Sequence, residues 1–378
     1  MTPDHCRYGA HVAARAIQKA FLEIRRSWRA EPDSQGLSAI EVFRLAVEPL
    51  GIELRELGCG AFELRHGGDV HRFQEMTSDL ENAFTYWLTG HKHMTFETLR
   101  EAGISELPHD KMYSIRSIEE ARRDFRERRR AVVVKPCFGT SGGQGVTVGI
   151  TNEKDLRRAI YSALCHDRQF IVEDFVAGES FRLLFLDGRL LSALRRLPAS
   201  VTGDGVATVQ ELIDRENARR SRLRGFAALY SIQVDHDVRR HLEAQGRSLR
   251  AVPAAGERVF LRSVSNFGSG GETEDVTDLV CDETVDLCRR IVKVLRIKLA
   301  GIDIITRDIG LPISETGGVI NEVNTSPCLN LHYAVRNADK AKDVAREVLL
   351  DMFPSARAQA AAATSTTAAT PGSAGVQR

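Results

Sequence analysis

The stretch that decides the fold is Ala131-Val-Val-Val-Lys-Pro136, followed directly by Cys137-Phe-Gly-Thr-Ser-Gly-Gly-Gln-Gly-Val-Thr-Val-Gly-Ile150. The apolar run before Lys135 predicts a strand, and the β-branched run that ends at Ile150 predicts a second one. The loop between them is rich in glycine, which leaves backbone N–H groups open to anionic oxygens. Lys135 adds a point charge at the end of the first strand. The pattern indicates a phosphate-binding hairpin, but an ordinary glycine-rich hairpin with a surface lysine would look the same.

The composition is that of an ordinary globular chain. Its 378 residues suggest two or three compact units, at roughly 150 residues per domain. A net charge of +1 argues against a nucleic-acid partner. The seven cysteines include no C-x-x-C pair, which favours a reduced chain over a disulfide framework or a zinc site. No apolar stretch approaches the ~20 residues of a membrane span or forms a signal-peptide core. We therefore expect a soluble, cytoplasmic protein with no membrane partner.

Hydrophobic periodicity predicts a small α/β unit at the N-terminus, over residues 1–76. It contains helices over residues 10–29 and about 38–50, and strands at 52–57 and 61–65. The expected downstream strands lie at 170–176, in a 181–196 hairpin that turns on Asp187-Gly188, and at 300–305 and 319–324. The expected downstream helices cover 152–165, 203–250, 276–299 and 339–352, and residues 126–130 form a solvated basic helix face. Residues 354–378 are mostly Ala, Thr, Ser and Gly, which predicts a disordered tail.

The last predicted strands carry oxygen ligands. Glu322 and Asn324 are two residues apart, so both side chains leave the same face of a strand. Asp303 lies between isoleucines in an apolar strand, where an unpaired carboxylate would cost several kcal/mol. Two carboxylates and an amide oxygen suit Mg²⁺ that is held partly by nucleotide phosphates. The alternative is that Asp303 and Glu322 pair with nearby Arg or Lys side chains.

Two lysines and the end of another strand add to the expected nucleotide site. Lys92 and Lys135 are both placed at strand ends and would bring positive charge to one nucleotide, although Lys92 alone would be taken for a surface residue. The backbone after Glu173 could bind an adenine edge. The usual nucleotide motifs are absent: there is no G-x-x-x-x-G-K-[ST], Val148 replaces the third glycine of G-x-G-x-x-G, and neither H-R-D nor D-F-G occurs.

The order of these motifs closely resembles the ATP-grasp superfamily of carboxylate–amine ligases. It is most similar to the ATP-grasp domain of cyanophycin synthetases and of bacterial fused glutathione synthetases. The motifs that carry this resemblance are Val134-Lys-Pro136, Arg195-Arg-Leu-Pro-Ala199, Gly203–Leu212, Val252–Arg262, Asn266-Phe-Gly-Ser-Gly-Gly271 and Glu322-Val-Asn-Thr-Ser-Pro327. They run in order over about residues 77–350, and the residues before them show no such match.

The resemblance implies an α/β ATP-grasp fold after the small N-terminal unit. The ATP-grasp domain would cover residues 77–353, with a lid subdomain at about 112–178 and a C-terminal subdomain at about 179–353. The implied ATP-binding residues are Lys92, Lys135, Gly139, Thr140, Ser141, Gly142, Gly143, Gly145, Glu173, Asp174, Val176, Glu179 and Ser180. Asp303, Glu322 and Asn324 would bind Mg²⁺ or Mn²⁺, and Arg182 and Arg196 would stabilise the acyl-phosphate and the tetrahedral anion. The acceptor loop would be Asn266, Gly268, Ser269, Gly270 and Gly271.

Two positions depart from the family pattern. The ribose-binding acid usually stands two residues after the hinge glycine, where this chain has Ser180, with Glu179 one residue early. Many relatives have arginine two residues before the first metal acid, where this chain has Gly301. The second departure shifts the task of stabilising the intermediate to Arg182 or Arg196.

The implied reaction joins a carboxylate to an amine at the expense of ATP, through an acyl-phosphate. Three hypotheses follow: a ligase for an amino acid or short peptide, a ligase that modifies a protein or polymer terminus, or a non-catalytic nucleotide-binding regulator. In the second, the basic helix would dock an acidic polymer. The resemblance also allows a homo-oligomer.

Overall fold

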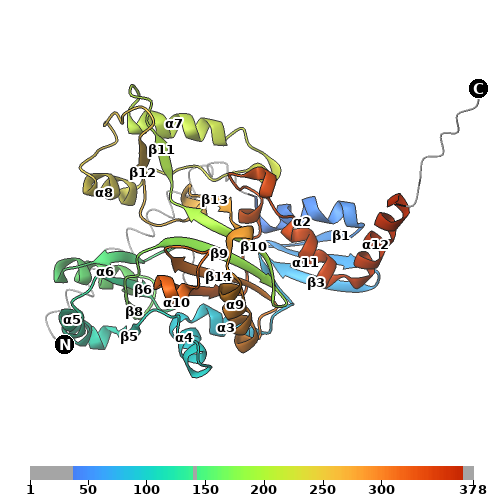
Figure 1. Ribbon diagram of the computed structural model, residues 1–378, viewed down its shortest axis with the longest axis horizontal. Helices are drawn as coiled ribbons and strands as arrows, with labels where there is room; N and C mark the ends of the chain where they lie inside the picture. The colour runs from blue at the N-terminus through green and yellow to red at the C-terminus, as the bar shows by residue number, and fades with distance from the viewer. Residues whose placement is uncertain (1–36, 139–142, 369–378) are drawn as a thin grey trace, which may run out of the picture.

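The computed structural model describes residues 37–138 and 143–368 (Figure 1). The helix expected over residues 10–29 and the loop residues Gly139, Thr140, Ser141 and Gly142 lie outside the described residues, as does the stretch 369–378. No helix in the described part of the chain is long and apolar enough to cross a membrane.

The N-terminal unit is the predicted combination of a helix and a sheet. Helix α2 (Ala39–Val47) is followed by the short helix η1 (Glu48–Leu50), and Gly51 ends it in the left-handed conformation, with φ of 64°. The sheet has the order β1-β2-β3-β4, with strands Glu53–Gly58, Ala61–His66, Asp69–Gln74 and Thr77–Ser78. The rings of Phe62 and Phe73 stack at 5.0 Å under this helix. The unit shares one apolar core with Leu184, Leu186 and helix α11 (Val344–Met352), so it packs directly on the rest of the chain.

A five-stranded antiparallel sheet forms the centre of the molecule. Its order is β13-β10-β9-β14-β15, with strands Glu272–Asp275, Arg189–Leu197, Glu179–Leu186, Leu299–Thr306 and Val319–Asn324. Asp187 and Gly188 join β9 to β10 with φ values of 47° and 75°, as a two-residue hairpin turn requires. Helices α3 (Ala83–Gly90), α4 (Lys92–Glu101) and α9 (Asp282–Leu295) cover one face, where Phe181, Leu183 and Ile302 lie. These helices do not cover the opposite face of the sheet, so polar side chains can lie there.

The predicted hairpin lies in a separate lobe. Strands β5 (Asp110–Ser114), β6 (Val132–Pro136), β7 (Thr147–Ile150) and β8 (Gln169–Asp174) form a sheet of order β5-β8-β6-β7. Helices α5 (Ile118–Arg128) and α6 (Glu153–Leu164) supply its apolar core, together with Val132 and Val134. Both arms of the strand–loop–strand motif are therefore confirmed.

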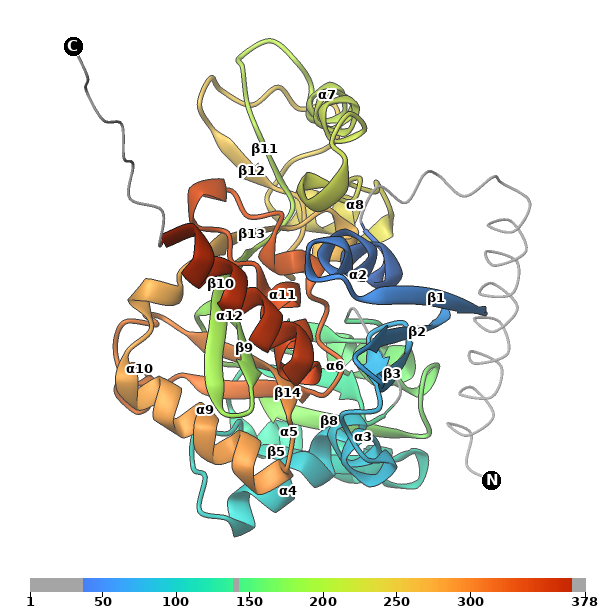
Figure 2. The ribbon, with the colours of Figure 1, turned by 90° about the vertical axis from the view of Figure 1, so that its right-hand side faces the viewer.

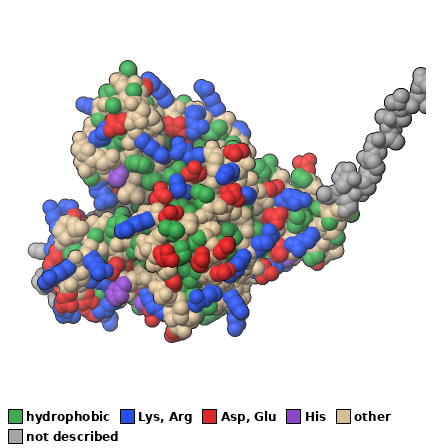
Figure 3. Space-filling model, in the orientation of Figure 1, with side chains coloured by type: hydrophobic (Ala, Val, Ile, Leu, Met, Phe, Trp, Pro, Cys, Tyr) green, Lys and Arg blue, Asp and Glu red, His purple; other side chains and the backbone are tan. Residues whose placement is uncertain are grey.

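A second lobe contains the segment that was expected to be helical over residues 203–250. Only α7 (Val209–Arg220), η3 (Gly225–Ala227) and α8 (His236–Ala244) are helical there, and strands β11 (Ser200–Thr202) and β12 (Arg258–Phe260) pair beside them. Glycines with positive φ at positions 205, 225 and 246 break the continuous helix. In the space-filling view the outline is indented between this lobe and the lobe of α5 and α6 (Figure 3).

The prediction of a disordered tail is wrong for its first part, because residues 354–368 form helix α12 (Pro354–Ala368). Alanine has the highest helix propensity, and Phe353 and Ala356 are buried in the core shared with the N-terminal unit. Figure 2 shows α12 lying beside α11. The remaining short elements are η2 (Ile115–Ser117), η4 (Phe267–Ser269), η5 (Thr277–Leu279), α10 (Ile313–Thr316), η6 (Asn330–His332) and η7 (Ala338–Lys340).

Candidate active site

Three neighbouring strands bring the predicted arginine and the two predicted metal acids into one row. Asp303 on β14 lies directly opposite Arg182 on β9 and directly opposite Glu322 on β15. Directly opposed residues of an antiparallel pair point to the same face of the sheet. Asn324, two residues after Glu322, shares that face and is paired with Gly301. The row therefore lies on the sheet face that α9 does not cover.

Asp303 is held by both candidate catalytic arginines. Arg182 donates Nε–H and Nη2–H to the two carboxylate oxygens, the second bond at 2.9 Å, and Arg196 donates Nη1–H to Oδ2 at 2.9 Å. Burial raises the pKa of Asp303, but the two guanidinium groups more than reverse this and keep the pKa below its ordinary value. Burial in turn lowers the pKa of Arg182, and Asp303 restores it to above the ordinary value. The carboxylate is therefore ionised and paired with arginine. This pairing is the alternative to direct metal binding that the sequence left open.

Gly301 explains how Arg182 reaches this position. A Cβ atom at residue 301 would lie 2.9 Å from Cβ of Pro327 and 3.3 Å from Cδ and Nη1 of Arg182. The arginine side chain from β9 thus lies across the glycine on β14. An arginine is absent from position 301 in the sequence, and the guanidinium of Arg182 occupies the adjacent space.

Lys92 reaches the same row from the other side. Its Nζ lies 3.1 Å from Oε1 of Glu322. The prediction of a strand end is wrong here, because Lys92 is the first residue of α4, with His91 as its N-cap. The Lys92 N–H donates to the carbonyl of Cys137 at 3.3 Å, and His91 forms a β-bridge with Phe138. These contacts tie the start of α4 to the strand that carries Lys135.

Lys135 pairs with the predicted adenine-binding residue. Its Nζ lies 2.6 Å from Oε2 of Glu173, and both side chains are buried between β6 and β8. The Lys135 ammonium also lies 5.4 Å from the ring centre of Phe96. Burial raises the pKa of Glu173, and the lysine opposes that shift. The adjacent Asp174 accepts a hydrogen bond from Arg128 at 2.9 Å.

The remaining predicted ATP-binding residues lie on β9, on the turn between β6 and β7, and just after β8. Glu179 begins β9 and lies 3.3 Å from Nε of Arg195, while Ser180 is the strand partner of Arg196. Gly145 has φ of 73°, and a Cβ there would lie 2.8 Å from Pro136, so this turn needs glycine. Gly143 also has a positive φ, of 75°. Val176 follows the end of β8.

The expected acceptor loop lies at the edge of the sheet opposite to β15. Asn266 caps η4 by accepting a hydrogen bond from the Gly268 N–H at 3.1 Å. The loop leads into β13, where Thr273 is paired with Arg196. The sheet thus brings the loop and the arginine to neighbouring strands.

The acids and the amide have the chemistry of a Mg²⁺ site that needs further ligands. Among residues 37–138 and 143–368, no group of three or more His, Cys, Asp or Glu side chains could hold a metal ion. Asn324 has a buried amide atom, Nδ2, without a hydrogen-bond partner. The oxygen and nitrogen of a carboxamide exchange places on a flip, so this position suits a ligand oxygen. Asp303, Glu322 and Asn324 therefore fit Mg²⁺, with phosphate oxygens and water as the remaining ligands.

Two residues that contact predicted site residues were missed in the sequence. Phe96 stands four residues after Lys92, on the same side of α4, and this i, i+4 spacing was a usable signal. Arg195 pairs with Glu179 and lies 3.6 Å from Glu274, and no spacing in the sequence pointed to that.

A buried Ser–His–Asp cluster was also not expected from the sequence. Nδ1 of His332 lies 2.8 Å from the Ser192 hydroxyl, which donates to Asp275 at 3.2 Å. In a catalytic triad the histidine stands between the serine and the acid, whereas here the serine stands between the other two. All three side chains are shielded from solvent. The cluster is therefore a structural network and not a nucleophile.

The chain is similar to known proteins over most of its length. No family model matches the chain. It is 34% identical to a cyanophycin synthetase of Synechocystis sp. over 78% of this chain and 33% of that protein. It is 31% identical to a glutathione biosynthesis bifunctional protein of Desulfotalea psychrophila, over 68% of this chain and 33% of the relative.

A solved structure supports the same relationship. The bifunctional glutathione synthetase of Pasteurella multocida matches with a TM-score of 0.59 and 27% identity, covering 83% of this chain and 43% of that one. The chain spans about a third of the length of the curated relatives. The likeness extends over more than three-quarters of the chain both in sequence and in fold, and it is consistent with an ATP-grasp carboxylate–amine ligase.

Proposed function

We propose that the chain forms an amide or peptide bond between a carboxylate and an amine on an amino acid or short peptide. ATP transfers its γ-phosphoryl group to the carboxylate and leaves as ADP. The amine then attacks the acyl-phosphate and releases phosphate. The observation that carries the proposal is the row of Arg182, Asp303 and Glu322 on one sheet face, with Lys92 paired to its end.

In this proposal the site residues orient the substrates and stabilise negative charge. Lys92 and Lys135 would contact the phosphates, and Arg182 with Arg196 would stabilise the negative charge that develops on the acyl group. Asp303, Glu322 and Asn324 would hold Mg²⁺, which neutralises phosphate charge when it is bound. No protein nucleophile is needed, because the phosphoryl group goes directly to the substrate.

Each of these cations is paired with a carboxylate in the structure. Lys92 is paired with Glu322, Lys135 with Glu173, and both arginines with Asp303. Buried charges are costly unless they are paired, so each phosphate-binding cation already has a carboxylate partner. Nucleotide phosphates would replace these carboxylates, and the acids would then face the metal ion.

The basic helix gives little support to docking of an acidic polymer. Arg122 and Arg126 pair with Glu153, at 2.8 Å for Arg122, and Arg128 pairs with Asp174 at 2.9 Å. These ion pairs neutralise much of the charge on which that alternative depended. A small carboxylate substrate is therefore the better proposal, and a regulator would not need the complete set of site residues.

The proposal includes a cytoplasmic location, because no disulfide joins Cys59, Cys137, Cys281, Cys288 or Cys328 in the described part of the chain. A homo-oligomer stays a prediction from the resemblance.

Replacing one predicted metal ligand tests the assignment. Glu322→Gln keeps the shape of the side chain and removes its charge, so ADP formation should fall by roughly 100-fold or more while the fold is retained. The matched control is Glu315→Gln, which changes an exposed glutamate on α10. ADP release measured with Mg²⁺ and substrate, beside a melting curve of each variant, gives the result. Turnover within a few-fold of the parent protein in Glu322→Gln would reject the site.

A further inference from the structure

Arg220 is a fully buried arginine outside the row of site residues. It is the last residue of α7, in the lobe of α7 and α8, and its exposed fraction is 1%. It ranks first by volume among the fully buried side chains described. A buried guanidinium is stable only where its N–H groups have partners.

The partners of Arg220 join its lobe to the expected acceptor loop. Its Nη1–H groups donate to the carbonyl of Tyr230 at 2.7 Å and to the carbonyl of Gly270 at 2.9 Å. Nε–H donates to Glu216 at 2.7 Å, and Nη2 lies 3.4 Å from Glu272, the first residue of β13. One side chain thus contacts α7, the segment before α8, the loop and the strand after it.

The conformation of the loop depends on glycine at position 270 and on hydrogen bonds within the loop. Gly270 has φ of 88°, and a Cβ there would lie 2.8 Å from Cα of Ile232. The N–H groups of Ser269 and Gly271 both donate to the carbonyl of Asn266, at 3.2 and 3.0 Å. The loop is therefore closed by its own hydrogen bonds, and Arg220 donates to the carbonyl of Gly270.

The loop leads directly to the strand beside a candidate catalytic arginine. Leu197 is paired with Glu272 and Arg196 with Thr273. A Cβ at Gly271 would lie 2.9 Å from the carbonyl of Leu197. A shift of the loop would therefore move the surface next to Arg196, where the proposed amine must approach.

We infer that Arg220 is a positioning residue that fixes the Asn266–Gly271 loop, and through it the binding of the amine substrate. The effect on amine binding rests on the proposed ligase function, whereas the contacts of Arg220 with the loop do not depend on it. Arg220 does not touch the reacting atoms in this account. Its loss should weaken the amine step and spare the phosphorylation of the carboxylate.

The first experiment measures the loop directly. Amide hydrogen exchange is followed in the full chain for the parent protein and the variants Arg220→Lys, Gly270→Ala and Arg224→Lys. Arg224 is an exposed neighbour whose hydrogen bonds in the described part of the chain go to the carbonyls of Ser221 and Leu223, so it is the matched control. Exchange in residues 266–271 should be roughly ten-fold faster in the first two variants and unchanged in the control, with β9 and β14 unaffected. Parent-like exchange of this loop in Arg220→Lys would overturn the inference.

The second experiment separates the two half-reactions. Hydroxylamine is small and traps acyl-phosphate without the acceptor loop, so hydroxamate formation in Arg220→Lys should stay within about two-fold of the parent protein. The KM for the amino acid that serves as amine in the parent protein should rise roughly ten-fold. An equal fall in both reactions, or an unchanged amine KM, would overturn the positioning role. If the parent protein forms no hydroxamate, the proposed function fails, and hydrogen exchange still decides whether Arg220 anchors the loop.

Discussion

At the scale of single residues, the charge of Asp303 is balanced unequally by two arginines. Arg182 makes two hydrogen bonds to its carboxylate and is the more buried of the two, whereas Arg196 makes one. Removing one partner from a buried ion pair leaves an uncompensated charge, which is strongly destabilising. The two arginines should therefore differ in their contribution to stability.

A pair of matched substitutions tests this difference. Arg182→Met should lower the free energy of unfolding by about 3–5 kcal/mol, because Asp303 loses its bidentate partner. Arg196→Met should cost only about 1 kcal/mol, since Arg182 still satisfies both oxygens. Urea denaturation of both variants gives the comparison. An equal loss in the two variants would contradict the ion pairing described for Asp303.

His332 should make stability depend on pH. Burial lowers its pKa from 6.5 to about 3 in the folded chain. The unfolded chain binds a proton below pH 6.5, while the folded chain does not until about pH 3, so the free energy of unfolding falls as the pH falls through this window.

The matched variant is His332→Gln, which removes the titrating ring. Between about pH 7.5 and pH 5, the parent protein should lose roughly 2 kcal/mol more stability than this variant. Urea denaturation at the two pH values measures it. The same loss in both proteins would show that His332 is not the responsible group.

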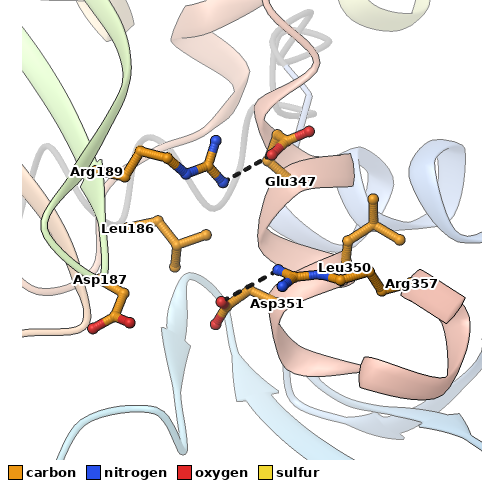
Figure 4. Close-up of a pocket in the computed structure, with 7 residues that line it drawn as sticks. All are labelled: Leu186, Asp187, Arg189, Glu347, Leu350, Asp351 and Arg357. Atoms are coloured by element: carbon orange, nitrogen blue, oxygen red, sulfur yellow. Dashed lines mark hydrogen bonds and ion pairs between the residues drawn. The ribbon is translucent and has the colours of Figure 1, made fainter. Parts of the chain in front are cut away.

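At the scale of elements, α12 is the clearest departure from the sequence prediction. Low complexity suggested disorder, yet Ala356 lies in the core beside α11 and the N-terminal unit. Figure 4 shows a neighbouring pocket of about 460 Å³, where Arg357 of α12 pairs with Asp351 at 3.6 Å and Arg189 pairs with Glu347 at 2.8 Å. This pocket lies at the hairpin end of β9, away from the row of Arg182 and Asp303.

A charge placed on each side of α12 tests its docking. Ala356→Glu buries a carboxylate and should destabilise the protein by about 2–4 kcal/mol. Ala358→Glu places the same group on an exposed position and should change stability by less than about 0.5 kcal/mol. Thermal unfolding of the two variants is the measurement. Equal melting temperatures would mean that α12 is not packed on the core.

At the scale of the whole molecule, the site is assembled from parts that are distant in the sequence. Lys92 comes from α4, Lys135 from the lobe of α5 and α6, and the acids from the central sheet. The five-stranded sheet aligns the row, and the two lobes stand on either side of the indentation (Figures 1 and 3). A nucleotide bound as proposed would therefore contact both the lobe of α5 and α6 and the central sheet.

The sequence predicted the local elements and turns well, but it predicted poorly which distant side chains contact one another. The β6–β7 hairpin, the Asp187-Gly188 turn and the two acid-bearing strands follow from periodicity and turn chemistry. The pairing of Asp303 with Arg182 does not, because strand register depends on contacts between residues 121 positions apart. Residues 203–250 were expected to be helical and charged, whereas only α7, η3 and α8 are helical there. Arg220 and Glu216 have the i, i+4 spacing of a helical ion pair, but no sequence pattern shows the contacts of Arg220 with Tyr230 and Gly270.

The measurement that tests the central claim most directly is trapping of the acyl-phosphate with hydroxylamine. The protein is incubated with ATP, Mg²⁺ and hydroxylamine, and a panel of amino acids and dipeptides is offered as carboxylate donors. The protein should form a hydroxamate with at least one carboxylate, only when ATP and Mg²⁺ are both present, and Lys135→Met should form none. Tight ATP binding without hydroxamate from any member of the panel would contradict a carboxylate–amine ligase for small substrates.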